Sequence, residues 1–287
     1  MASSPYTDLD RPPLGERALQ RALIVPGGFW RRLEIRGETG STNADAAAAG
    51  LAGAAEGLVV VAERQVAGRG RRDRQWVSPA RAGLTLSFLL RPGTADAERG
   101  WAPAPQRSWG WLPLLAGVAL REAVQRLAEV DAALKWPNDL LLGAGPAEAK
   151  AAGILAEVSG DAVVVGIGLN VTTRADELPE TTGLPATSLR LAGAEATDRD
   201  PLLRALLRGV ARWYAGWREA GGDAEMCGLL AAYQRDCATI GRDVRVLLPN
   251  REEFTGTATT VDGDGQLVVR TADGERRVSA GDVLHVR

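Results

Sequence analysis

The stretch Leu58-Val-Val-Val-Ala-Glu-Arg-Gln-Val-Ala-Gly-Arg-Gly-Arg-Arg-Asp-Arg-Gln-Trp76 joins an apolar run to a loop rich in arginine. Residues 58–62 are typical of a buried strand. Gly68 and Gly70 are expected to permit positive φ angles and a close approach of the backbone to a ligand. Each arginine offers a planar, permanently charged fork that matches carboxylate or phosphate oxygens two at a time. The loop therefore predicts a site for a small, multiply charged anion, formed by Arg69, Arg71, Arg72 and Arg74.

The loop alone is equally consistent with a solvated basic run that contacts nucleic acid. The rest of the chain argues against that interpretation. Its 34 Lys and Arg residues face 36 Asp and Glu residues, and the formal charge of -2 gives no overall field that attracts DNA or an anionic membrane. The positive charge is thus a local feature, as expected of a substrate site.

Composition limits the protein class and the chemistry. The 287 residues suffice for one large domain with a buried core and a second small one. The N-terminus has no basic and apolar signal segment, and no later run of about 18 apolar residues would span a bilayer, so we expect a cytoplasmic protein that does not enter membranes.

Cys227 and Cys237 lack the spacing of zinc ligands and are expected to be buried or idle thiols. Because His285 is the single histidine, catalysis must use lysines, arginines, carboxylates, backbone amides and a bound Mg²⁺.

Hydrophobic periodicity predicts a lead-in, a mixed α and β region and a terminal run of short strands. The lead-in, residues 1–30, is expected to hold one short helix and to be too short for a winged-helix DNA-binding domain. Ser41 or Thr42 is the natural N-cap of an alanine-rich helix. We expect helices at 14–23, 44–52, 111–128 and 200–233, and strands at 32–35, 58–62, 84–90, 140–142, 153–158, 162–171, 244–248, 253–261, 266–270 and 275–278.

Gly166 and Gly168 interrupt the apolar strand at 162–171. Glycines in such a strand mark a bulge or a place where a ligand lies on the backbone, and a tight crossing of strands explains them equally well. From about residue 240 the short strands and their Asp-Gly turns predict a small β-barrel.

With these elements in order, the chain resembles the biotin protein ligases over nearly its whole length. The resemblance is specific because the motifs occur in the family's order. They are Ser41-Thr-Asn43, Gln65 followed by Gly68-Arg-Gly-Arg-Arg72 and Trp76, Lys135-Trp-Pro-Asn-Asp139, Lys150-Ala-Ala-Gly-Ile-Leu-Ala-Glu157, and Gly166-Ile-Gly-Leu-Asn170.

The resemblance implies an α+β catalytic domain of the class II synthetase-like type, shared with lipoate ligases, with a mixed sheet and a C-terminal SH3-like barrel. It implies an N-terminal lead-in at 1–30, a catalytic domain at 31–238 and the barrel at 239–287, without an N-terminal DNA-binding domain. The implied activity is formation of biotinyl-5′-AMP from biotin and ATP with Mg²⁺, followed by transfer of biotin to one lysine of the biotin carboxyl carrier domain of an acyl-CoA carboxylase such as acetyl-CoA carboxylase. We expect a monomer or weak homodimer that binds no nucleic acid.

Residue roles follow from the same resemblance. Arg69, Arg71 and Lys150 are the expected catalytic groups, because positive charge is needed where the biotin carboxylate meets an anionic phosphate. Asp139 is the expected Mg²⁺ ligand. Biotin and its adenylate are expected to contact Ser41, Thr42, Asn43, Gln65, Arg69, Gly70, Arg71, Lys150, Gly166 and Gly168, and ATP is expected to contact Arg72, Arg74, Trp76, Lys135, Asn138 and Asn170.

Three alternatives remain at the level of sequence. A lipoate or octanoate ligase would have the same fold, but the Ser-Thr-Asn and Gly-Arg-Gly-Arg-Arg motifs resemble the biotin branch. A DNA-binding regulator would need a helix-turn-helix, for which we expect the lead-in before Ser41 to be too short. A biotin-binding protein without catalysis is suggested by one departure, Asp73, which stands where the family commonly has glycine and places a carboxylate in the anion loop.

We predict that Arg71→Gly retains part of the adenylation activity but releases biotinyl-AMP, because the loop loses a cation that holds the phosphate. The measurement is the amount of free biotinyl-AMP after incubation with biotin and ATP. Retention of the intermediate at the wild-type level would contradict the role given to Arg71.

Overall fold

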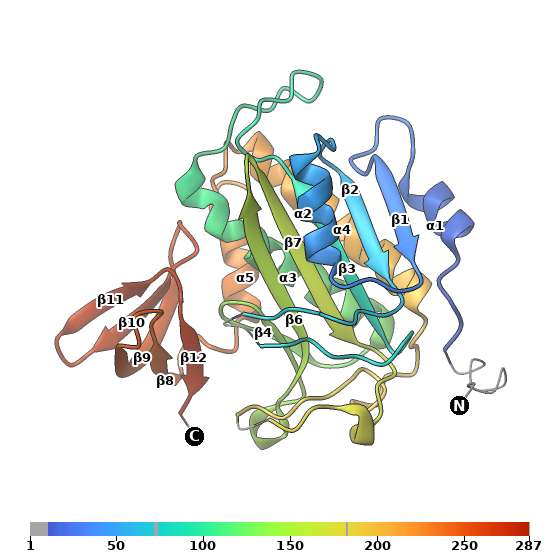
Figure 1. Ribbon diagram of the computed structural model, residues 1–287. Coiled ribbons are helices and arrows are strands. Elements are labelled where there is room, and N and C mark those ends of the chain that lie inside the picture. Colours follow the sequence, from blue (N-terminus) through green and yellow to red (C-terminus); the bar gives the residue numbers. More distant parts are fainter. Residues whose placement is uncertain (1–10, 72–73, 182, 287) are drawn as a thin grey trace.

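A computed structural model describes residues 11–71, 74–181 and 183–286. Seven strands form one sheet in the order β1-β2-β3-β7-β6-β5-β4, in which only β1 and β2 are parallel. Helix α2 lies on the front of this sheet, and α3 and α4 lie behind it (Figure 1). The elements are α1 (Glu16–Leu23), β1 (Arg32–Arg36), α2 (Thr42–Leu51), β2 (Leu58–Ala62), β3 (Gly83–Leu90), α3 (Trp111–Ala128), β4 (Ala132–Lys135), β5 (Asp139–Leu142), β6 (Ala149–Ser159), β7 (Ala162–Asn170), α4 (Arg199–Glu219) and α5 (Leu229–Asp236), with short 3-10 helices at 106–110, 145–147 and 175–177.

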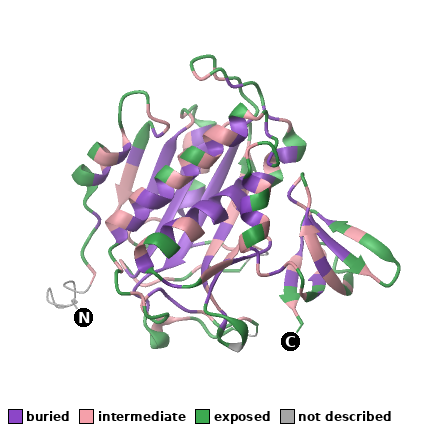
Figure 2. Cartoon of the chain, turned by 180° about the vertical axis from the view of Figure 1, so that it is seen from behind, coloured by how far each residue is buried: buried purple, intermediate pink, exposed green. Residues whose placement is uncertain are grey.

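Side chains alternate between the two faces of the sheet, as the pleat requires. On β7, Val165 and Ile167 join the large core behind the sheet, whereas Val164 joins a small cluster beneath α2. The same alternation assigns Gly166 and Gly168 to the front face. Behind the sheet, apolar contact is nearly continuous, and Figure 2 shows these strands and helices as largely buried.

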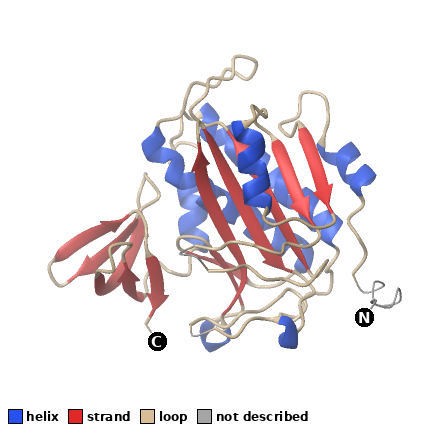
Figure 3. Ribbon diagram, viewed as in Figure 1, coloured by secondary structure: helices blue, strands red, loops and turns tan. Residues whose placement is uncertain are grey.

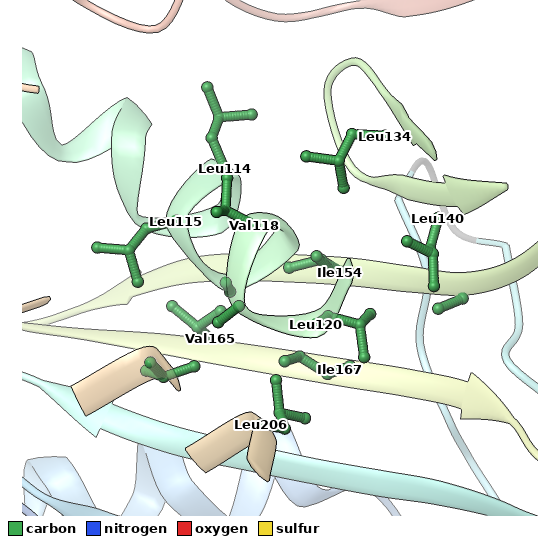
Figure 4. Close-up of a cluster of buried hydrophobic side chains, with 14 of the residues drawn as sticks. Leu114, Leu115, Val118, Leu120, Leu134, Leu140, Ile154, Val165, Ile167 and Leu206 are labelled. Atoms are coloured by element: carbon green, nitrogen blue, oxygen red, sulfur yellow. The ribbon is translucent and has the colours of Figure 1, made fainter. Parts of the chain in front are cut away.

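The large core holds the sheet to the helices behind it. Leu115, Val118 and Leu120 of α3 lie in one apolar cluster with Ile154 of β6, and Leu206 joins this cluster from α4 (Figure 4). Burying one such side chain fully contributes about 1.5–3 kcal/mol. This face of the sheet is therefore the rigid support for whatever lies on the other face.

The lead-in is attached to the sheet through a buried ion pair. Arg199 of α4 pairs with Glu63, which directly follows β2, at 2.6 Å, and both side chains are almost wholly buried. Glu63 also accepts a hydrogen bond from the backbone N–H of Leu14 at 2.7 Å. Arg199 donates to the Pro12 carbonyl at 2.6 Å and to the Gly83 carbonyl at 3.2 Å. A buried charge needs such partners, and they secure the ends of β2 and β3.

A second, smaller sheet is antiparallel throughout and belongs to the C-terminal barrel. The barrel docks beside the main sheet (Figure 1) through two buried tryptophans. The Trp111 indole donates to the Gly263 carbonyl at 2.7 Å, and the Trp136 indole donates to the Gly265 carbonyl at 3.1 Å. Its strands are β8 (Asp243–Leu247), β9 (Glu253–Val261), β10 (Leu267–Thr271), β11 (Gly274–Val278) and β12 (Asp282–His285), in the order β11-β10-β9-β8-β12.

The predicted elements are largely confirmed, and three differ. The helix expected over 200–233 is two helices, because Gly221 and Gly222 have φ angles of +64° and +88° that end α4. Strand β4 and strand β12 were missed, since both are four-residue segments that alternate too briefly to be recognised. Among the described residues, no helix combines the length and apolar composition needed to cross a bilayer.

We predict that Leu206→Ala lowers the free energy of unfolding by about 2–5 kcal/mol, because it leaves a cavity in the core between α4 and the sheet. Equilibrium unfolding in urea measures this. The matched control is Leu51→Ala, whose side chain is 71% exposed and should change stability by less than about 0.5 kcal/mol. Equal losses in the two variants would contradict the assignment of the core.

Candidate active site

A cavity of about 1210 Å³ opens on the front of the sheet, beside the barrel. The loop between β2 and β3 crosses the front of the sheet here (Figure 3). Every site residue predicted from the sequence lines this cavity except Arg72, which lies outside the described residues together with Asp73. The cavity lining therefore includes Ser41, Thr42, Asn43, Gln65, Arg69, Gly70, Arg71, Arg74, Trp76, Lys135, Asn138, Asp139, Lys150, Gly166, Gly168 and Asn170.

One part of the cavity lining consists of hydroxyl and amide side chains. Ser41 is the N-cap of α2, and its hydroxyl accepts from the Ala44 N–H at 3.5 Å, as the sequence predicted. Gln65 Oε1 accepts from both the backbone N–H and the hydroxyl of Thr42, at 2.7 and 3.0 Å. Ser87 of β3, fully buried, lies 2.7 Å from the Thr42 hydroxyl. These contacts hold a set of donors and acceptors in defined orientations.

Asn43 connects these side chains to the floor of the sheet. Its Oδ1 accepts from Ser87 at 2.6 Å, and its Nδ2 donates to Glu157 at 2.7 Å. The side chain lies directly on Gly166, where an added Cβ atom would stand 1.9 Å from Asn43 Oδ1. Gly166 is thus required for close approach of a side chain to the strand, rather than for a bulge.

The arginine loop folds back on itself as a narrow hairpin. The Trp76 N–H donates to the Gly68 carbonyl at 2.9 Å, and the Gly70 N–H donates to the Arg74 carbonyl at 2.6 Å. Neither Gly68 nor Gly70 uses the positive φ angle that glycine permits. Gly68 meets a packing constraint instead, since a Cβ atom there would lie 2.3 Å from the Trp76 carbonyl oxygen.

The described guanidiniums of this loop point to three different parts of the protein. Arg69 forms an ion pair with Glu157 of β6 at 3.1 Å. Arg71 donates to Asn138 Oδ1 at 3.4 Å. Arg74 forms an ion pair with Asp282 of the barrel. The arginines are therefore spread around the cavity rather than gathered at one point.

Trp76 covers part of the floor. Its indole ring lies so close to Gly168 that a Cβ atom there would stand 2.4 Å from the ring, and it also contacts Gly153. In this conformation the indole, and not open space, lies on the backbone of β7 at Gly168. A flat ligand ring that used this floor would have to share it with Trp76 or displace it.

Two lysines of the cavity lining flank Asp139. Lys150 Nζ is 2.6 Å from Asp139 Oδ1, and Lys135 Nζ is 3.6 Å from Asp139 Oδ2. Burial lowers the pKa of Lys135; Asp139 opposes this shift and Lys150 reinforces it. This cluster supplies positive charge within a largely buried wall.

The surroundings of Asp139 do not fit a resident Mg²⁺. Its carboxylate already faces two ammonium groups, which repel a divalent cation. The described part of the chain also contains no group of three or more His, Cys, Asp or Glu side chains that would hold a metal. A Mg²⁺ in this cavity would need oxygen ligands from a substrate.

Sequence reasoning missed several residues of the cavity or its support. Ser87 carried a weak signal, as a hydroxyl within an apolar strand, and Glu157 belonged to a quoted motif without a role. The others come from the barrel or from the loop that meets it and had no local signal. They are Glu148, Arg242, Arg245, Asp282 and His285.

His285 is held between the barrel and the main sheet. Arg242 donates to its Nδ1 at 3.1 Å, so a neutral ring carries its proton on Nε2, which lies 3.1 Å from the Thr239 hydroxyl. Arg242 also forms a bidentate ion pair with Glu148, at 2.6 and 2.5 Å. Burial, then the charges of Lys135 and Arg242, lower the pKa of His285 to about 4.

Two families match this chain. Residues 41–172 match the biotin/lipoate A/B protein ligase family, and residues 239–286 match the biotin protein ligase C-terminal domain. The chain is 42% identical over 287 residues to the biotin–[acetyl-CoA-carboxylase] ligase of Mycobacterium tuberculosis, and the match covers 98% of this chain and 100% of that protein. It is 30% identical over 235 residues to the bifunctional ligase/repressor BirA of Bacillus spizizenii, covering 80% of this chain and 66% of that protein.

Solved structures agree with these matches. The biotin protein ligase of Aquifex aeolicus in complex with biotin and ATP superposes with a TM-score of 0.71 at 28% identity, covering 90% of this chain and 100% of that chain. The chain therefore belongs to the biotin protein ligase family. The resemblance and the fold class inferred from the motifs are confirmed.

We predict that acid destabilises the protein partly through His285. The unfolded ring binds a proton below about pH 6.5, whereas the folded ring does so only near pH 4, so stability falls as the pH drops from about 6.5 to about 4. The contribution is at most about 3 kcal/mol. Urea unfolding at pH 7 and pH 4.5 should show a smaller loss for His285→Gln than for the wild type, and parallel losses would contradict the assignment.

Proposed function

We propose that this protein activates biotin with ATP to form biotinyl-5′-AMP and then transfers biotin to a lysine of the biotin carboxyl carrier domain of acetyl-CoA carboxylase. The observation that carries the proposal is one cavity lined both by a set of hydroxyl and amide side chains and by several cationic side chains. Such a cavity suits a ligand with a neutral polar head and a carboxylate tail. The similar protein of Mycobacterium tuberculosis is a biotin–[acetyl-CoA-carboxylase] ligase, and this supports the choice of acceptor.

The hydroxyl and amide side chains of the cavity would bind the ureido head of biotin. Thr42, Asn43 and Gln65 supply hydroxyl and amide groups, and Ser87 orients two of them from the strand below. Because these groups are held by the protein before any ligand binds, little ordering is needed on binding. Ser41, as N-cap, keeps the first turn of α2 beside these groups.

The cationic side chains of the cavity would serve the chemical step. An oxygen of the biotin carboxylate attacks the α-phosphorus of ATP, the bond to the bridging oxygen breaks, and pyrophosphate leaves. Lys150, Arg69 and Arg71 would offset the negative charge of carboxylate and phosphate as they approach. The amine of the acceptor lysine then attacks the acyl carbon of the adenylate, and AMP leaves.

ATP would lie against Trp76, Lys135 and the Asn138 side of the cavity. Asn138 is oriented by its own hydrogen bond to the Ile154 carbonyl at 3.0 Å, and Asn170 by one to the Thr187 carbonyl at 3.0 Å. We propose that Mg²⁺ enters as the ATP complex, bound by phosphate oxygens, since Asp139 is paired with lysines.

The remaining features of the proposal concern the whole protein. We propose a catalytic unit at 31–238 that carries the lead-in at 1–30, and a barrel unit at 239–287. We also propose that the enzyme acts in the cytoplasm as a monomer or weak homodimer, with no nucleic-acid partner.

We predict ATP–pyrophosphate exchange that depends on biotin, because only a bound carboxylate completes the adenylation site. The assay is run with biotin, with lipoate and without acid. Lys150→Gln should lower the rate by about 10²–10³, because it removes a charge that acts on the reacting oxygens. Arg126→Gln, which removes one exposed positive charge of α3, is the matched control and should not change the rate.

Each outcome is informative. Exchange with lipoate in place of biotin would assign the protein to the neighbouring branch of the family. An absence of exchange with either acid would contradict the proposed catalysis and favour a protein that only binds biotin.

A further inference from the structure

The arginine loop makes a charged contact with the barrel that no local sequence pattern indicated. Arg74 pairs with Asp282, 208 residues further along the chain. Asp282 begins β12 and lies at the cavity wall, with a side chain only 18% exposed. The sequence predicted Arg74 as an ATP contact, whereas the structure directs its guanidinium to the protein.

The barrel is well placed to hold this loop because it is itself firmly docked. Besides the two indole hydrogen bonds to the turn at 263–265, the Trp136 N–H donates to the Thr239 hydroxyl at 3.0 Å. The Ala238 N–H donates to the Leu134 carbonyl at 2.7 Å. Asp282 therefore belongs to a domain whose position is set by contacts away from the loop.

The effect of this contact reaches the catalytic arginines through the backbone. The carbonyl of Arg74 accepts the N–H of Gly70 at 2.6 Å, and Arg69 pairs with Gln75 across the same hairpin. Gly70 stands between Arg69 and Arg71 in the chain. An anchor at Arg74 thus limits where these two guanidiniums lie.

We propose that Asp282 is a positioning residue, through which the C-terminal barrel holds the arginine loop over the activated acid. This inference rests on the proposed function. The negative charge of Asp282 pairs with Arg74 and also acts on Lys135 of the catalytic unit. Its carboxylate is therefore balanced by cations of the catalytic unit, as a contact between the two units requires.

The solvent exposure of Arg74 determines how much is lost when its ion pair with Asp282 is removed. The Arg74 side chain is 62% exposed, and ion pairs that are partly in water contribute little to folding. Asp282→Asn should therefore leave the free energy of unfolding close to the wild-type value. It should increase the fraction of molecules in which the arginine loop is separated from the barrel. We expect about a two- to fivefold change in measurements that depend on the loop.

The first experiment needs no substrate. Limited trypsin digestion of the ligand-free, full-length protein should cleave within residues 69–74 about two- to fivefold faster in Asp282→Asn than in wild type. The matched control is Asp273→Asn, which makes the same charge change at an exposed turn of the same barrel. Equal cleavage in both variants would overturn the proposal.

The second experiment follows the intermediate. With biotinyl-AMP formed on the enzyme, Asp282→Asn should release it about two- to fivefold faster and raise the KM for ATP more than it lowers kcat, and Asp282→Glu should restore both. If Asp282 acts through Arg74, the double variant Arg74→Gln/Asp282→Asn should release biotinyl-AMP no faster, and have no higher KM for ATP, than Arg74→Gln alone. If the effects of the two substitutions multiply, Asp282 does not act through Arg74 and the proposal is overturned.

The two experiments separate this inference from the proposed function. If wild-type enzyme shows no exchange with biotin, the proposed function fails, while the proteolysis result still decides whether Asp282 holds the loop. If exchange is normal and Asp282→Asn behaves as Asp273→Asn does, only the positioning role fails.

Discussion

The alternation of side chains across β3, β6 and β7 is the constraint on which the rest of the structure depends. Residues that point backward are apolar and bind the sheet to α3 and α4. Of the residues that point forward, Leu89 and Val164 pack beneath α2, whereas those toward the cavity are small or polar, with Ser87 and Gly166 as examples. A shift of one residue in register would exchange the two faces and lose both the core and the site.

The cations of the cavity are held by carboxylate or amide partners within the protein. Each described cation that we assign to chemistry or positioning already has a protein partner, so an anionic ligand exchanges these partners rather than meeting bare charge. The partners are Glu157 for Arg69, Asn138 for Arg71, Asp282 for Arg74, and Asp139 for Lys135 and Lys150. The protein partners reduce the repulsion between these cations when no ligand is bound. A ligand is favoured when its oxygens can replace the partner atoms at the same positions.

The barrel completes this arrangement from a distance in sequence. Arg242 and Asp282 both place their charges at the cavity wall, opposite Glu148 and Arg74. The tryptophans that dock the barrel donate to backbone carbonyls, which fixes orientation as well as contact. The barrel therefore belongs to the wall of the site and is more than an appended domain.

The sequence by itself determined the family, the mixed α and β fold and a set of polar and charged residues that line the cavity, because motifs such as Ser41-Thr-Asn43 and Lys135–Asp139 are local and ordered. Hydrophobic periodicity also predicted the exact bounds of α3 and β2, because the apolar pattern of a helix or strand lies within that one segment of the sequence. Only the tertiary structure decided which groups meet. The ion pair of Arg74 with Asp282, the indole of Trp76 on Gly168 and the lysines around Asp139 arise from docking and packing between distant segments, and no local pattern encodes such distances.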